Sequence, residues 1–263
     1  MDVWIEPEAD AVAQLAADFV QDAVGAGEIT LGLATGTTPV ATYRELIRRH
    51  REEGLSFDRV HVVLLDEYVG LAPDHPQSYR RFIRDTFTNA VGISPDRVHG
   101  PAGDAVDLAA AGADYEALLR RLPPRALQLR GIGRDGHIGF NEPTSTLASR
   151  TRVKTLHPDT RADNARFFAD GEAVPVHALT MGIGTILEAR RLVLLAIGDA
   201  KAAAVAAAVE GPVSASVPAS ALQLHPAAMV LIDEAAAGGL AHRAYHAEVA
   251  AHRPAWQRPG AGA

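Results

Sequence analysis

Short apolar runs recur along the chain and alternate with amphipathic segments. Each run has four to seven residues, the length of a strand, and an unbroken apolar run is typical of a strand that both faces of a parallel sheet bury. Gln128 and Arg130 are unusual polar residues within the third run. The predicted strands are Ile29–Ala34, Val60–Leu65, Ala126–Ile132, Val176–Met181, Leu192–Ile197 and Met229–Ile232.

Segments with helical periodicity lie between these runs. Ser78 and Asp104 are suited to cap helices because their side-chain oxygens accept hydrogen bonds from backbone amides, and Pro39 is suited to a first helical position. The predicted helices are Pro39–Arg51, Ser78–Ala90, Asp104–Arg121, Asp159–Phe168, Thr185–Ala189 and Ala200–Val209.

The alternation of strands and helices predicts an α/β fold with a doubly wound, mostly parallel sheet, a modified Rossmann-like domain. No linker rich in proline, glycine or serine divides the chain, so we expect one domain over residues 1–252. Residues 253–263 are rich in proline, glycine and alanine, and we expect this tail to be disordered.

Composition narrows the function classes. The 263 residues include no cysteine, which excludes a disulfide scaffold, a thiolate metal site and a cysteine nucleophile, and fits a cytoplasmic protein. A net charge of −7 disfavours nucleic acid and anionic membranes as partners, so a phosphorylated ligand would need a locally basic pocket. No apolar run is long enough to span a membrane, and the first residues do not resemble a signal peptide. The eleven histidines show no zinc-ligand spacing, so no metal is expected.

Three loops at the predicted carboxyl ends of strands carry polar clusters, and ligands bind at these ends in doubly wound sheets. The first cluster spans residues 34–39 and includes Gly36, Thr37 and Thr38 before a helix. Small residues, hydroxyls and a helix N-terminus together favour an anion. The segment lacks the Walker A and GxGxxG patterns, so a nucleotide is poorly supported, and an ordinary capped turn remains an alternative.

The second cluster is acidic. Asp66 and Glu67 directly follow an apolar run, where a carboxylate is well placed to act as general base or acid. The alternatives are a solvated loop carboxylate and a cap on a neighbouring helix.

The third cluster spans residues 131–143, in which four glycines fall within nine residues and predict a tightly turned loop. The loop contains Asp135, His137 and Glu142. Carboxylates beside a histidine tune its proton affinity and fix its tautomer, so this group is suited to proton transfer. A glycine turn around a buried structural histidine is the competing interpretation.

These motifs also carry a resemblance. The strings LGLATGTTPVATY, LLDEYVGL, GRDGHIGFNEP with SRTRVKTL, and ALQLHP resemble, in order, those of the glucosamine-6-phosphate deaminase family. The similarity extends from about residue 29 to about residue 234, and DEYVGL together with DGHIGFNEP is highly specific. Thr37 and Gly139 stand where the family is expected to have glycine and alanine.

The resemblance implies a cofactor-independent enzyme that converts glucosamine 6-phosphate to fructose 6-phosphate and ammonia by acid–base catalysis. It implies that His137 assists opening of the sugar ring, with Asp135 and Glu142 orienting it. Asp66 would be the base that moves a proton from C2 to C1. Each step relies on acid–base catalysis, which is why the resemblance implies neither a metal nor a redox cofactor.

The resemblance also implies the binding residues. Gly36, Thr37, Thr38, Arg166 and Lys201 would hold the phosphate. Lys201 has independent support, because a cation at a helix start opposes the helix dipole unless an anion binds there.

In allosteric members of the family, residues matching Ser145, Arg152 and Lys154 bind N-acetylglucosamine 6-phosphate between subunits. On an extended segment Arg152 and Lys154 would share a face and could converge on one anion; a solvated basic strand edge is the alternative. Members occur as monomers and as hexamers, so a homo-oligomer is one of two expectations.

Other functions remain open. A galactosamine-6-phosphate deaminase differs only in the C4 epimer it takes. A 6-phosphogluconolactonase resembles this family in fold but lacks the Asn141–Pro143 motif and the intact DEYVGL. A non-catalytic sugar-phosphate sensor would not need all four acid–base candidates.

Overall fold

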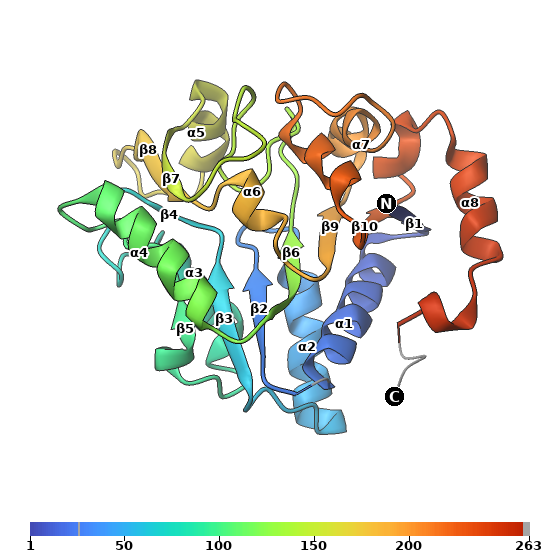
Figure 1. Cartoon of the computed structure of the whole chain (residues 1–263), viewed down its shortest axis with the longest axis horizontal. Helices are drawn as coiled ribbons and strands as arrows, with labels where there is room; N and C mark the ends of the chain where they lie inside the picture. Colours follow the sequence, from blue (N-terminus) through green and yellow to red (C-terminus); the bar gives the residue numbers. More distant parts are fainter. Residues whose placement is uncertain (26, 260–263) are drawn as a thin grey trace.

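The computed structural model describes residues 1–25 and 27–259. Its centre is a seven-stranded sheet in the order β1-β10-β9-β6-β2-β3-β5, and all the neighbouring strands are parallel. Figure 1 shows β2, β3 and β6 running side by side, with their carboxyl ends toward α5 and the small sheet above them. The strands are β1 (Asp2–Glu6), β2 (Ile29–Leu33), β3 (Val60–Leu64), β5 (Val98–His99), β6 (Arg125–Arg130), β9 (Leu192–Ala196) and β10 (Ala228–Asp233).

The order of the strands creates a switch point. From β2 the chain builds outward through β3 to β5, then returns to place β6 on the other side of β2 and continues through β9 to β10. The connections after β2 and β6 therefore leave the sheet in opposite directions and open a crevice at their carboxyl ends. The predicted doubly wound, mostly parallel fold is confirmed, and five of its strands match predicted runs.

Helices cover both faces of the sheet. On one face, α1 (Ala9–Gly25) and α2 (Val40–Glu53) bury Phe19 and Leu46 against apolar strand residues. The other face is covered by α4 (Leu108–Arg121), α6 (Ile183–Ile186), α7 (Ala202–Val209) and the 3-10 segment η4 (Pro218–Leu224).

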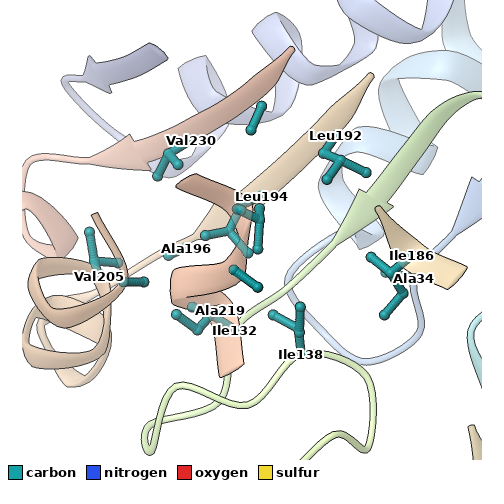
Figure 2. Packing of buried hydrophobic residues seen from close by; sticks show 14 of the residues in the cluster. Ala34, Ile132, Ile138, Ile186, Leu192, Leu194, Ala196, Val205, Ala219 and Val230 are labelled. Carbon is teal, nitrogen blue, oxygen red and sulfur yellow. The ribbon is translucent and has the colours of Figure 1, made fainter. Parts of the chain in front are cut away.

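The hydrophobic core between this second face and its helices extends beneath the loops that carry the predicted site. Figure 2 shows Ile132 and Ile138, which flank the glycine-rich turn, close to the side chains of β9. Both residues are buried, as is Ala34 at the end of β2. The polar loop therefore packs against buried apolar side chains of the core.

A second, antiparallel sheet lies at the carboxyl edge of the first. It has the order β4-β8-β7, with strands β4 (Asp66–Tyr68), β8 (His177–Thr180) and β7 (Arg152–Thr155). The run Val176–Met181 was expected in the parallel sheet, and this expectation is wrong. Its strand pairs with β4 and β7 instead, because Met181 donates to the Leu65 carbonyl (2.7 Å) and continues the ladder beyond the end of β3.

Two of the predicted helix starts need correction. Pro39 is the N-cap of α2, one residue before the first helical position, and Asp107, not Asp104, caps α4. The Asp107 carboxylate accepts from the Ala109 and Ala110 amides at 3.0 and 2.9 Å. Ser78 caps α3 (Tyr79–Ile83) as predicted, and that helix continues as the π-helical segment η1 (Arg84–Thr88).

The remaining predicted helices differ at their ends. The helix predicted at Asp159–Phe168 is α5 (Pro158–Ala165), and α6 ends before Ala189. Before α7, Asp199–Lys201 forms the 3-10 segment η3, so Lys201 is the N-cap of α7.

Both ends of the fold contain elements that were not predicted. Strand β1 and helix α1 precede the first predicted element, and α8 (Arg243–Ala251) follows the last. In the tail, the Arg253 guanidinium lies 3.5 Å from the centre of the Trp4 ring, and Ala255–Gln257 forms the short 3-10 segment η6. Residues 260–263 lie outside the described residues, so the expected disorder there stays a prediction.

Candidate active site

A cavity of about 320 Å³ opens at the carboxyl ends of β2 and β6. Its walls come from the loops after these two strands, from β4, from α3 and α5, and from η3. This is the switch point of the sheet, where parallel α/β folds bind ligands. The predicted site residues that line it are Gly36, Thr37, Thr38, Asp66, His137, Arg166 and Lys201.

Asp66 and Glu67 are sequence neighbours with different surroundings. Strand β4 alternates its side chains, so Asp66 lies in the cavity wall while Glu67 points away from it. The Glu67 carboxylate accepts from the Ser78 hydroxyl and from the amides of Tyr79 and Arg80, at 2.8, 3.1 and 3.2 Å. Glu67 thus caps the start of α3, and Asp66 is the carboxylate left for chemistry.

Asp66 is held in an environment that disfavours its charge. Only 5% of the residue is exposed. Burial raises the pKa of its carboxyl to about 7; the negative charge of Glu67 adds to the rise, and His137 and the Phe140 amide oppose it. A carboxylate with this pKa binds protons far more tightly than an ordinary aspartate, as a general base working near neutral pH should.

His137 is fixed by the two carboxylates that the sequence singles out. Its Nδ1 lies 2.7 Å from Asp135 Oδ1 and 3.6 Å from Glu142 Oε2. The Asp135 carboxylate also accepts from the His137 amide (3.1 Å). Burial acts to raise the pKa of Asp135, but hydrogen bonding and attraction to His137 outweigh it and hold that pKa well below its usual range. Asp135 therefore stays ionised beside the ring.

The glycines of this loop make room for the ring. A side chain at Gly133 would place its Cβ 2.3 Å from the His137 imidazole, and Gly136 has a φ of +84°. At Gly139, a Cβ would lie 3.1 Å from Asp66 Oδ2. The loop therefore brings its backbone against both acid–base groups, and only small residues allow this.

A second part of the cavity lining is suited to an anion. Helix α2 begins after Gly36, which has a φ of +87°, and no side chain caps its first turn. The Val40 amide donates to the Thr37 carbonyl (3.3 Å), and the next amides of the first turn are left for a ligand. Lys201 donates from Nζ to the Ile132 carbonyl (2.7 Å), and burial together with the positive charge of Arg134 lowers the pKa of its ammonium. Arg166 lies exposed just after α5.

Only one carboxylate–histidine group among the described residues has the spacing of a metal site. Asp135, His137 and Glu142 each offer a ligand atom, all within 4.8 Å of one another. The two carboxylates also hold the loop, because Asp135 accepts from the His137 amide (3.1 Å) and Glu142 Oε1 accepts from the His157 amide (3.1 Å). The expectation that no metal is needed stays a prediction.

The three residues with an expected regulatory role lie outside this cavity. Ser145 is buried, and its hydroxyl donates to the Glu142 carbonyl (2.6 Å). Arg152 and Lys154 lie two apart on β7, an edge strand, as the expected extended segment requires. The Arg152 guanidinium donates to the Asn141 side chain (2.7 Å), and thus contacts the residue next to Glu142.

Two features of the cavity were not predicted from the sequence. One is an aromatic wall in which Tyr68 contacts Tyr79 and Phe140, with ring centres 5.0 and 5.4 Å apart. The other is an ion pair between Arg134 and Asp163, both of which line the cavity. Arg134 stands inside the quoted motif, but its partner is 29 residues away in the sequence, and no local pattern connects the two.

Comparisons with known proteins place the chain in a family. The model of the family described as glucosamine-6-phosphate isomerases/6-phosphogluconolactonase matches residues 6–231. The chain belongs to this family. It is 54% identical to the glucosamine-6-phosphate deaminase of Corynebacterium kroppenstedtii, over 98% of this chain and 100% of that protein. The enzyme of the same name from Streptomyces coelicolor is 50% identical, over 98% and 99% of the two chains.

Solved structures of the family share the fold. A monomeric glucosamine-6-phosphate deaminase superimposes with a TM-score of 0.88 at 46% identity, covering 91% of this chain and 100% of that one. The 6-phosphogluconolactonase of Trypanosoma brucei reaches a TM-score of 0.71 at 19% identity, over 91% and 98% of the chains, which shows the fold alone. Within the described residues, no helix is both long and apolar enough to span a membrane.

Proposed function

We propose that this family member isomerises and deaminates glucosamine 6-phosphate, giving fructose 6-phosphate and ammonia. The observation that carries the proposal is the meeting of two acid–base groups in one cavity: the buried Asp66 and the His137 group. A lactone hydrolysis needs no base for a carbon-bound proton, whereas an aldose–ketose conversion does. The relatives of the same name, about half identical over nearly the whole chain, support the same activity.

His137 acts first in this scheme. Opening the sugar ring requires a proton to leave the anomeric hydroxyl and another to reach the ring oxygen. An imidazole can carry out both transfers, and the neighbouring Asp135 carboxylate stabilises the imidazolium that forms between them. Glu142, buried beside the same ring nitrogen, fixes its orientation.

Asp66 then moves the carbon-bound proton. It takes the proton from C2, which leaves an enolamine, and the return of a proton to C1 gives an imine at C2. Water adds to this imine, and ammonia leaves as the ketose forms. Because burial already raises the pKa of Asp66 to about 7, the carboxylate is a stronger base than an exposed aspartate.

In this proposal the phosphate binds at the second part of the cavity lining. The amides after Gly36, the hydroxyls of Thr37 and Thr38, and the cations Arg166 and Lys201 together supply donors and positive charge. Placed there, the phosphate would direct the sugar carbons toward Asp66 and His137.

Ammonia release by the purified protein tests the proposal. Glucosamine 6-phosphate, galactosamine 6-phosphate and 6-phosphogluconolactone should be compared at equal concentrations, with ammonia measured for the two amino sugars and acid release for the lactone. We expect ammonia from the gluco substrate at a rate well above that from the galacto substrate, and no lactone hydrolysis above background. Absence of ammonia from either amino sugar would contradict a deaminase, and a faster galacto substrate would favour the epimeric enzyme.

Regulation and assembly stay predictions. Arg152 and Lys154 on β7 would bind an anion such as N-acetylglucosamine 6-phosphate, and the contact from Arg152 to Asn141 gives such a ligand a route to the catalytic loop. A monomer and a hexamer both remain consistent with this chain. A cytoplasmic location, supported by the absence of cysteine, is part of the same proposal.

Substrate saturation curves with and without N-acetylglucosamine 6-phosphate, for the wild type and Lys154→Ala, test the regulation. A wild type whose curve does not change with this effector would contradict it.

A further inference from the structure

The ion pair between Arg134 and Asp163 bridges two walls of the cavity. Arg134 lies in the glycine-rich loop after β6, and Asp163 lies on α5. A single nitrogen of the guanidinium, Nη2, contacts both carboxylate oxygens, at 2.5 and 2.7 Å. Within residues 1–25 and 27–259, no hydrogen bond engages Nε or Nη1 of Arg134, so most of its donors are left for another group.

This pair is poorly explained as a stabilising contact. The side chains are 59% and 52% exposed, and exposed ion pairs contribute little to folding because water screens them and both side chains lose freedom. An interaction of this kind exchanges partners easily. Its place inside the cavity lining, not on an outer helix face, points to a role in binding.

The surroundings of the pair are the proposed phosphate end. Lys201 lies within electrostatic reach of four charged groups: Arg134 and Arg166 act on it as cations, and Asp163 and Asp135 as anions. Of these anions, Asp135 is already engaged with His137. Asp163 is therefore the carboxylate that balances three neighbouring cations in the described structure.

A bound phosphate changes this balance. Its charge of about −1.5 to −2 near neutral pH matches the three cations better than a single carboxylate does. The same charge would repel Asp163. Guanidinium groups bind phosphate through two parallel hydrogen bonds, a geometry that Arg134 does not make with Asp163.

We propose that Arg134 is a substrate-recognition residue that Asp163 holds in the free enzyme and releases to the substrate phosphate. The inference deepens the proposed function and rests on it. Arg134 contacts the phosphate in the complex, while Asp163 acts as a competing anion that keeps the guanidinium at the cavity mouth.

Steady-state kinetics with glucosamine 6-phosphate test the exchange. Arg134→Gln should raise KM about 10-fold or more with kcat within about twofold, because a charge-assisted contact made equally in ground and transition states is lost. Arg134→Lys keeps the positive charge but loses the paired donors of the guanidinium, so its KM should lie between those of Arg134→Gln and the wild type. Asp163→Asn should lower KM by about two- to fivefold, because the phosphate no longer competes with a carboxylate. Arg48→Gln is the matched control, because it removes exposed ion pairs between an arginine and the glutamates Glu45 and Glu52 on α2. Its KM should equal that of the wild type.

Calorimetric titration with inorganic phosphate separates this inference from the proposed reaction, because it needs no turnover. Phosphate affinity should fall in Arg134→Gln and rise in Asp163→Asn, whether or not the protein releases ammonia. Unchanged KM and phosphate affinity in Arg134→Gln would overturn the proposal. If Asp163→Asn raises KM and lowers phosphate affinity as much as Arg134→Gln does, then Asp163 only positions Arg134. The proposed exchange of Asp163 for phosphate would then be wrong.

Discussion

Replacement of Arg130 by leucine should stabilise the protein. Arg130 ends β6, it is fully buried, and none of its three guanidinium nitrogens has a hydrogen-bond partner within the described residues. Burial and the positive charge of Arg125 lower its pKa to about 9. No carboxylate among the described residues compensates for this charge.

The size of the effect follows from this environment. Each tenfold loss of proton affinity corresponds to about 1.4 kcal/mol, so the depressed pKa represents a burial cost on the order of 4–5 kcal/mol. Leucine is shorter than arginine, and the space left behind should cost about 1–2 kcal/mol. We therefore expect Arg130→Leu to raise the free energy of unfolding by about 2–4 kcal/mol, or the melting temperature by about 4–8 °C.

Urea unfolding followed by circular dichroism measures this difference. Arg125→Leu is the matched control, because Arg125 lies on the same strand but donates to Thr185 and Met181. Its loss should give no stabilisation, since it removes contacts as well as charge. If Arg130→Leu unfolds at the same or a lower urea concentration than the wild type, the reasoning about the unpaired guanidinium is wrong.

Four further changes have expected outcomes. Asp66→Asn should reduce turnover about 10²–10⁴-fold. Because the native pKa of Asp66, about 7, lies above its unfolded value, the wild type loses stability as the pH rises from about 4 to about 7. Urea unfolding should therefore show the variant to be more stable than the wild type by about 2–4 kcal/mol at pH 8, with no such gain at pH 4. Gly133→Ala should reduce kcat strongly in a protein that still folds, because its Cβ would lie 2.3 Å from the His137 ring; near-normal kcat would contradict that packing. Thr144→Gly should raise stability by about 1 kcal/mol in thermal unfolding, since Thr144 has a φ of +74°. Lys201→Ala should raise KM for glucosamine 6-phosphate and narrow the preference over glucosamine, and an unchanged preference would place the phosphate elsewhere.

The centre of the fold could be predicted because burial on both faces leaves a direct mark on the sequence. Runs such as Leu192–Ile197 are apolar throughout, and this one is a central strand. Strand β1 leaves a weaker mark, because an edge strand is only partly buried and Asp2–Glu6 mixes polar and apolar residues. The run Val176–Met181 is a strand, but its composition does not say to which of two sheets it belongs.

The candidate site could be predicted where its residues are close in sequence. Asp135, His137 and Glu142 fall in one loop, and the structure brings them together. Contacts between distant segments left no such signal. The Arg134–Asp163 pair joins a loop to a helix 29 residues later, and only the positions of β6 and α5 in space bring the two side chains together.

The different positions of the Asp66 and Glu67 side chains show that the site depends on contacts between elements distant in the sequence. A strand turns neighbouring side chains to opposite sides, so one carboxylate enters the cavity and the other meets the start of α3. Capping α3 fixes the Glu67 charge beside Asp66, where it helps to raise the pKa of the catalytic candidate. The contact that anchors the helix therefore also tunes the base, and replacing Glu67 would change both the fold at α3 and the pH at which Asp66 can accept a proton.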